Sequence, residues 1–179
     1  PATGDTWYAN GDSHAGSIAV ARPNQTGATS LLSNLRAFVG WDFAGGWAWL
    51  HVRSDLGSRP YELYRVPIDL STGPALVATD DSADFTRRAV RGDGQVAWIR
   101  GAGGSSTLST TAMATGATQT LPGVSSFGPT LTFTPAGSVA FTRGGGAGGP
   151  VFAVWTPGSP AIALAVVGAV DGFVLPIGP

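Results

Sequence analysis

A repeated pattern with a period of 42 to 46 residues is the feature that most restricts the fold of this chain. Four turns end in a glycine that follows threonine or proline, at Gly27, Gly73, Gly116 and Gly158, and these glycines are separated by 46, 43 and 42 residues. A period of this length indicates that each repeat is one supersecondary unit, which buries its apolar surface against neighbouring copies.

Each unit contains the same succession of strands. Three segments carry a tight turn with glycine, then alternating large apolar residues, then arginine: AGGWAWLHVR at 44–53, DGQVAWIR at 93–100 and AGSVAFTR at 136–143. Alternation with a period of two residues predicts a half-buried strand. One strand precedes each of these segments and two more follow, so a complete unit has strands A, B, C and D. The A strands are expected at 36–43, 85–92, 129–137 and 171–178.

Counted along the chain, the strands predict an all-β fold. They indicate a β-propeller of four blades, each with four antiparallel strands, and one blade is split between the N- and C-termini. The first B strand is expected at Thr6–Asn10. Pairing of the last strand with the first ones would close the ring without an open sheet edge. The predicted blades of this single domain are 1–34 plus 170–179, 35–80, 84–123 and 127–168.

The turn sequences resemble a known family. PAGSVAFTR at 135–143 and GDGQVAWIR at 92–100, together with DLSTG at 69–73, look like the WD-like repeat of TolB-type β-propellers. The usual Ser-Pro-Asp-Gly turn of that family is matched in part by TPAG at 134–137 and GDG at 92–94. The resemblance implies the fold and leaves the function open, because propellers serve many roles.

Two alternatives to a closed four-bladed ring stay open. Another glycine-rich all-β fold, a sandwich or a jelly roll, would also contain many similar strands. The chain could also be part of a larger ring, or two chains could combine into eight blades as a homo-oligomer.

Composition excludes several classes of function. The net charge is −1, and the ten arginines are dispersed without any lysine, so the basic stripe required for nucleic-acid binding is missing. There is no cysteine, which excludes disulfides and thiolate metal sites. No run of about 18 apolar residues predicts a membrane span. The chain begins at Pro1 without methionine, and we expect an extracellular or periplasmic protein.

Arginine recurs at one position of the repeat and is the first candidate for ligand binding. Arg53, Arg100 and Arg143 end three of the four B strands. They could form a ring of guanidinium groups for an anionic ligand, or each could pair with a neighbouring blade. We expect ligands on the face that holds the D-to-A and B-to-C loops.

Acidic residues supply the remaining candidates. Asp42, Asp93 and Asp171 lie on or near A strands, where paired carboxylates could act as in glycosidases, and Trp41 could contact a sugar. Asp80, Asp81 and Asp84 form the densest carboxylate cluster. Calcium prefers several oxygen ligands, but the cluster lacks the spacing of an EF-hand loop and is also typical of a solvated turn.

The function predicted from these patterns is non-catalytic. We expect a binding or scaffold propeller that contacts a protein, peptide or glycan through its loop face, as in a subunit of an extracellular assembly. The alternative is a carbohydrate-active hydrolase or a calcium-stabilised lectin that uses aspartates at the mouth of the central channel, which the innermost A strands line in a propeller. No catalytic residue is assigned and no cofactor is expected, and calcium would enter only with the lectin alternative.

Overall fold

The fold is all-β, as the sequence predicted. A computed structural model of the chain describes residues 4–10, 16–54, 61–80, 87–101, 106–124, 127–144 and 151–165. Within these ranges the regular structure consists of strands, and no helix long and apolar enough to cross a membrane is found there.

Fourteen strands are present in the described residues, and they overlap the predicted A strands at 36–43, 85–92 and 129–137 and the four predicted B strands. They are β1 (Thr6–Asn10), β2 (Gly16–Ala21), β3 (Ala28–Ala44), β4 (Trp47–Ser54), β5 (Tyr61–Pro67), β6 (Ala75–Asp80), β7 (Arg88–Val90), β8 (Gln95–Arg100), β9 (Ser106–Ala112), β10 (Thr118–Val124), β11 (Phe127–Phe133), β12 (Val139–Arg143), β13 (Val151–Trp155) and β14 (Ile162–Ala165).

Hydrogen bonding joins these strands into sheets of six, four and four, all antiparallel, rather than into four separate blades. The difference lies in β3, which contains both the predicted D strand of the first unit and the predicted A strand of the second. Its first half pairs with β2 and its second half pairs with β4. The two halves meet at Asn34–Leu35, where the chain stays extended although Asn34 has a positive φ of 58°.

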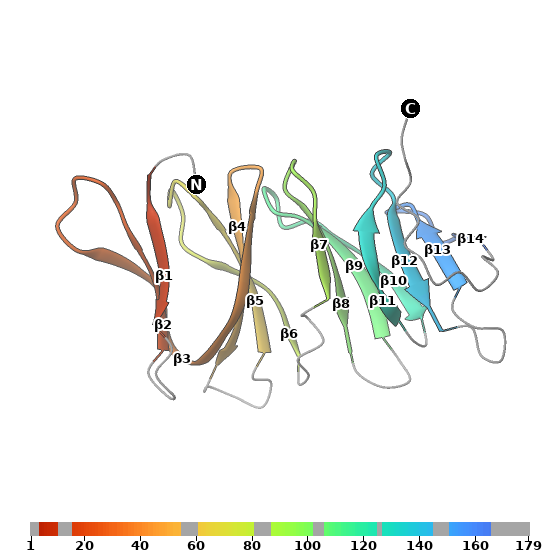
Figure 1. Cartoon of the computed structure of the whole chain (residues 1–179), viewed down its shortest axis with the longest axis horizontal. Coiled ribbons are helices and arrows are strands. Elements are labelled where there is room, and N and C mark those ends of the chain that lie inside the picture. Colours follow the sequence, from red (N-terminus) through yellow and green to blue (C-terminus); the bar gives the residue numbers. More distant parts are fainter. Residues whose placement is uncertain are drawn as a thin grey trace.

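The sheets follow one another along the longest axis of the molecule, with β1 at one end and β14 at the other (Figure 1). As far as the chain is described, they form an open series and not a closed ring. The predicted closing segment, 170–179, lies outside the described residues.

Three apolar clusters hold the series together. The first cluster lies between the two halves of the six-stranded sheet and includes Ile18, Val20, Leu50 and Val52. The second cluster joins β4 and β5 to β8, and the third joins the sheet of β7–β10 to the sheet of β11–β14. The buried members of the second cluster are Trp49, Leu63, Val96, Trp98 and Met113. Those of the third cluster are Ala97, Ile99, Leu108, Leu121, Val139, Phe141, Ala153 and Trp155.

The middle strands are buried on both faces, which explains why the predicted B strands are so apolar. On β4, Leu50 and Val52 point into the first cluster, whereas Trp49 points into the second. On β8, Trp98 and Ile99 divide in the same way between the second and third clusters. A strand covered by a sheet on each side needs apolar residues at successive positions.

Burial predicts very different costs for two leucine substitutions. Leu50 is fully buried, whereas the side chain of Leu76 on β6 is 53% exposed. We expect Leu50→Ala to lower the free energy of unfolding by about 3–5 kcal/mol because it leaves a cavity, and Leu76→Ala by less than about 1 kcal/mol. Urea unfolding of both variants measures this difference. Equal losses would contradict the packing described above.

Candidate functional site

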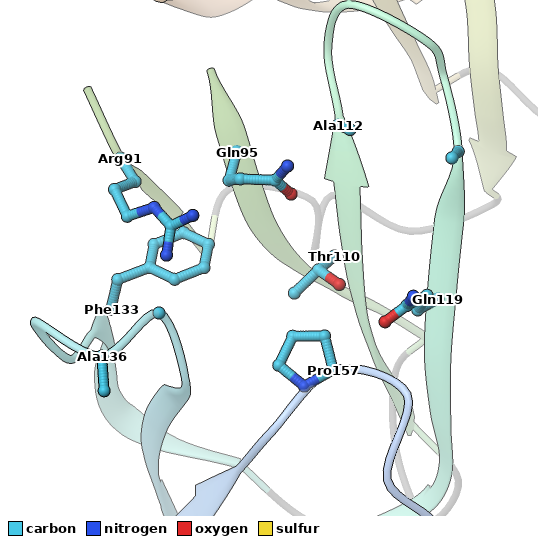
Figure 2. A pocket seen from close by; sticks show the side chains of 10 residues that line it. Arg91, Gln95, Thr110, Ala112, Gln119, Phe133, Ala136 and Pro157 are labelled. Carbon is cyan, nitrogen blue, oxygen red and sulfur yellow. The ribbon is translucent and has the colours of Figure 1, made fainter. Parts of the chain in front are cut away.

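A cavity of about 340 Å³ opens between the second and third sheets, at the end where their hairpin turns lie (Figure 2). We call it the turn-end cavity. The turns between β7 and β8, β9 and β10, β11 and β12, and β13 and β14 all contribute to it. Its lining residues are Arg91, Gln95, Thr110, Ala112, Ala117, Gln119, Phe133, Ala136, Gly137 and Pro157.

Two equivalent turns form one side of the cavity. Residues 91–95 and 134–138 each close with a backbone hydrogen bond to the first residue, from Gly94 to Arg91 and from Gly137 to Thr134, both at 2.9 Å. Gly94 and Gly137 have φ values of 86° and 85°, which glycine adopts without a steric cost. A Cβ on Gly137 would also collide with the guanidinium of Arg91, so glycine at position 137 gives Arg91 room to reach the neighbouring sheet.

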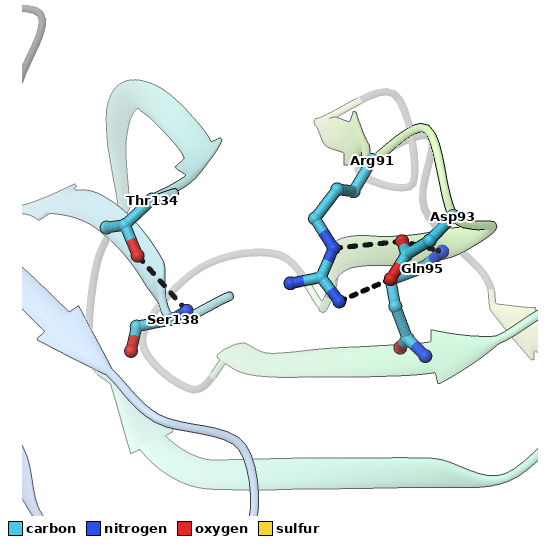
Figure 3. A network of polar contacts seen from close by, with 5 residues as sticks. All are labelled: Arg91, Asp93, Gln95, Thr134 and Ser138. Carbon is cyan, nitrogen blue, oxygen red and sulfur yellow. Dashed lines mark hydrogen bonds and ion pairs between the residues drawn. The ribbon is translucent and has the colours of Figure 1, made fainter. Parts of the chain in front are cut away.

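Arg91 is held in place by an ion pair with Asp93 (Figure 3). Its Nε and Nη2 atoms donate to the two carboxylate oxygens of Asp93 at 2.9 and 2.5 Å, and the backbone N–H of Gln95 donates to Oδ1 at 3.2 Å. These bonds lower the pKa of Asp93, and the bond to Asp93 raises the pKa of Arg91. The guanidinium lies 5.3 Å from the centre of the Phe133 ring.

The remaining lining is neutral. Figure 2 shows the amides of Gln95 and Gln119 and the hydroxyl of Thr110 around the cavity, with Pro157 opposite them. The ten residues that line the cavity include no carboxylate and no histidine. Because Asp93 offsets the charge of Arg91, the turn-end cavity offers hydrogen bonds and apolar contacts without a net charge. It therefore suits a neutral polar ligand.

No protein-family model and no curated protein sequence matches the chain. Among solved structures, TolB from Acinetobacter baumannii, a β-propeller, is similar with a TM-score of 0.54 at 14% identity, and the match covers 90% of this chain. The described chain has a β-propeller-like fold. It spans 41% of the TolB chain. A nidogen/laminin complex is similar with a TM-score of 0.47 at 13% identity, covering 84% of this chain and 55% of that one.

In this propeller-like fold the three predicted arginines lie at the opposite ends of the B strands from the turn-end cavity. The Nε of Arg100 donates to Asp80 at 3.2 Å, which links β8 to β6 of the preceding sheet. Arg53 lies 5.5 Å from the centre of the Tyr61 ring. Arg143 is half-buried at the end of β12 and is paired in register with Phe127 and Val151. The loops that would complete this face, at 11–15, 55–60, 102–105 and 145–150, lie outside the described residues.

The predicted acidic residues occupy separate places. Asp42 on β3 forms an ion pair with Arg88 of β7, Asp80 pairs with Arg100, and Asp93 pairs with Arg91. Asp81, Asp84 and Asp171 lie outside the described residues, and the described part of the chain contains no group of three residues able to hold a metal ion.

Trp41 packs against its neighbours on β3. Its ring centre lies 4.7 Å from that of Phe38 and 5.9 Å from that of Phe43. The half-buried ring also packs against the first apolar cluster.

The sequence pattern does not single out the cavity residues. It predicts ligands on the face of the D-to-A and B-to-C loops, whereas the cavity residues lie at the turns on the opposite ends of the strands. One signal was present. Gln95 and Gln119 are two of only three glutamines in the chain, and each stands at or next to the first residue of a strand that follows a turn. A long amide at the start of a strand remains near the turn, where it can reach a ligand.

The ion pair between Asp42 and Arg88 predicts that replacement of Asp42 lowers the stability of the fold. The Arg88 side chain is 17% exposed, so the loss of its partner leaves a largely buried guanidinium without compensation. We expect Asp42→Ala to lower the free energy of unfolding by about 1–3 kcal/mol and Asp42→Asn, which keeps an acceptor, by less. Chemical denaturation measures both variants, and an unchanged stability for Asp42→Ala would contradict the role of the pair.

His51 predicts a loss of stability in acid. Its side chain is fully buried on β4, and this burial, together with the charge of Arg88, lowers its pKa to about 4. An unfolded chain protonates this histidine near pH 6.5, so below that value protons favour the unfolded state. We expect the unfolding free energy to fall by about 2 kcal/mol between pH 7 and pH 5 through this histidine alone. Urea unfolding of the wild type and of His51→Gln at both pH values measures the effect, and an equal pH dependence would rule it out.

Proposed function

We propose that this chain is part of a β-propeller that acts as a non-catalytic binding scaffold, and that a peptide segment of a protein partner binds at the turn-end cavity. An extracellular or periplasmic location is part of the same proposal. The observation that carries it is the neutral, amide-rich lining of a cavity that lies between strand ends and hydrogen-bonded turns.

The chemistry of the lining matches that of a peptide group. Each amide of Gln95 and Gln119 offers two donors and one acceptor oxygen, as a backbone N–H and C=O require. Phe133 and Pro157 supply apolar contacts beside them. One face of the Phe133 ring is occupied by Arg91, which leaves less aromatic surface for the stacking that many sugars use. A peptide therefore fits this lining better than a glycan does.

The ion pairs of the aspartates support a role without catalysis. A general acid needs a pKa near the working pH, but the hydrogen bond from Arg91 lowers the pKa of Asp93. Asp42 and Asp80 each hold an arginine of the following sheet. Within the described chain these carboxylates connect sheets or turns, and none of them lines the turn-end cavity.

Selection of peptides from a displayed random library on the immobilised 179-residue chain tests the proposal. We expect the peptides that bind the wild type to bind Gln119→Ala at least about tenfold more weakly, which corresponds to about 1.4 kcal/mol. Fluorescence anisotropy of the labelled peptides measures their affinity. Because Gln119 is exposed, the variant should keep its stability.

Gln25 provides a matched control, since it is an exposed glutamine in the turn between β2 and β3, away from the cavity. Gln25→Ala should bind the selected peptides as the wild type does. Equal binding by the Gln119 variant would disprove the site. Binding of oligosaccharides on an array at the same residues, without peptide binding, would replace the peptide with a glycan. Addition of calcium or a chelator should change neither binding nor the melting temperature.

A further inference from the structure

A second cavity, of about 530 Å³, lies between the outer strand of the six-stranded sheet and one face of the next sheet. We call it the edge groove. It is separate from the turn-end cavity, which lies on the other side of the sheet of β7–β10. Its lining residues are Leu76, Val77, Ala78, Thr79, Trp98, Arg100, Thr107, Ser109, Thr118 and Thr120.

One wall of the edge groove is formed by consecutive residues of β6. Four consecutive residues, 76–79, line it, whereas a strand that turned only one face toward the groove would contribute alternate residues. A bulge assists this exposure, because the register passes from Ala78 opposite Leu63 to Leu76 opposite Tyr64 and leaves Val77 without a partner on β5. Bulges of this kind bend a strand and change the direction of its side chains.

The outer edge of β6 is not paired with any described strand. β6 is the last strand in the order of its sheet, with β5 on its other side. An unpaired edge presents a row of N–H and C=O groups that another extended chain can meet. Natural edges are often protected by a charge or a proline. At β6 these residues lie at the ends, with Pro74 before the strand and Asp80 as its last residue, and the residues between them that line the groove are Leu76, Val77, Ala78 and Thr79.

The opposite wall is a ladder of hydroxyl groups that bond to one another. Ser109 and Thr120 lie 3.0 Å apart, Thr111 and Thr118 lie 2.8 Å apart, and the Trp98 Nε1 donates to Thr111 at 3.0 Å. These hydroxyls already have partners on their own sheet. Besides the hydroxyls of Thr79 and Thr107, the unpaired edge of β6 offers backbone donors and acceptors to a ligand in the groove.

The groove is close to neutral. Arg100 is the one charged residue among those described as lining it, and Asp80 accepts a hydrogen bond from its Nε. A charged segment would gain little here and would lose its hydration. An uncharged segment with small or hydroxyl side chains matches the threonine and serine wall on one side and Leu76 on the other.

We propose that an extended, uncharged strand of a partner protein binds in the edge groove by pairing with β6. Its backbone continues the six-stranded sheet, and its alternate side chains lie against the hydroxyl ladder. This mode of recognition takes affinity from main-chain hydrogen bonds and selectivity from alternate side chains.

The test uses the full chain and a seven-residue peptide of alternating threonine and valine, acetylated and amidated at its ends. Amide hydrogen exchange followed by NMR should show new protection at residues 76–79 on addition of the peptide. Leu76→Lys, at a position that is 53% exposed, should weaken binding about tenfold or more by placing a charge on the edge. Ala163→Lys is the matched control on β14, the outer strand of the third sheet, and it should bind as the wild type does.

A second peptide separates backbone pairing from contact by side chains. Methylation of alternate backbone nitrogens keeps the side chains and removes the donors, so this peptide should not bind. Equal binding of the methylated peptide, no protection at residues 76–79, or unchanged affinity in Leu76→Lys would each overturn the proposal.

Two other occupants of the edge groove are outcomes of the same test. Protection that depends on protein concentration without peptide would identify a second copy of the chain as the occupant, and protection by maltohexaose alone would identify a sugar. Either result would also overturn the proposal. None of these outcomes depends on Gln119, so this test and that of the turn-end cavity fail separately.

Discussion

Burial of both faces of the middle strands is the interaction on which the rest of this structure depends. β4 and β8 each separate two apolar clusters, with Leu50 and Trp49 on opposite faces of one strand and Ile99 and Trp98 on opposite faces of the other. A single sheet of this composition would expose a large apolar surface to water. Each sheet is therefore stabilised by packing against the sheets next to it, as in other repeat proteins.

Arginines supplement this stacking with polar contacts between consecutive layers. The Arg65 guanidinium donates to the carbonyl of Ala114 at 3.0 Å, and that of Arg87 donates to the carbonyl of Phe127 at 2.7 Å. Arg88 and Arg100 reach back to aspartates of the preceding sheet. Arginine suits this task because its planar group offers five donors and remains charged. Much of the positive charge of the chain therefore serves to connect sheets.

Both candidate binding regions lie where the apolar filling between two layers ends. The turn-end cavity opens beside the third cluster, where glutamine and threonine replace large apolar residues. The edge groove opens beside the second cluster, where serine and threonine do so. In each case polar residues line the space between two sheets where their apolar packing ends. Among the residues that line these two regions there is no carboxylate, so the contacts they offer are mainly hydrogen bonds to neutral groups and apolar surface.

The sequence by itself determined the strands and their order, since apolar alternation and turn glycines depend on neighbours close in the chain. The A–B turns at Gly94 and Gly137 and the buried Trp49 and Trp98 could all be expected from that pattern. Only the tertiary structure decided that β3 runs unbroken between two layers, that Arg100 meets Asp80 twenty residues away, and that Gln95 and Gln119 face one cavity. The course of β3 depends on its pairing with β2 and then with β4. The other two features depend on how closely two sheets approach each other, and side chains that are remote in sequence set that distance.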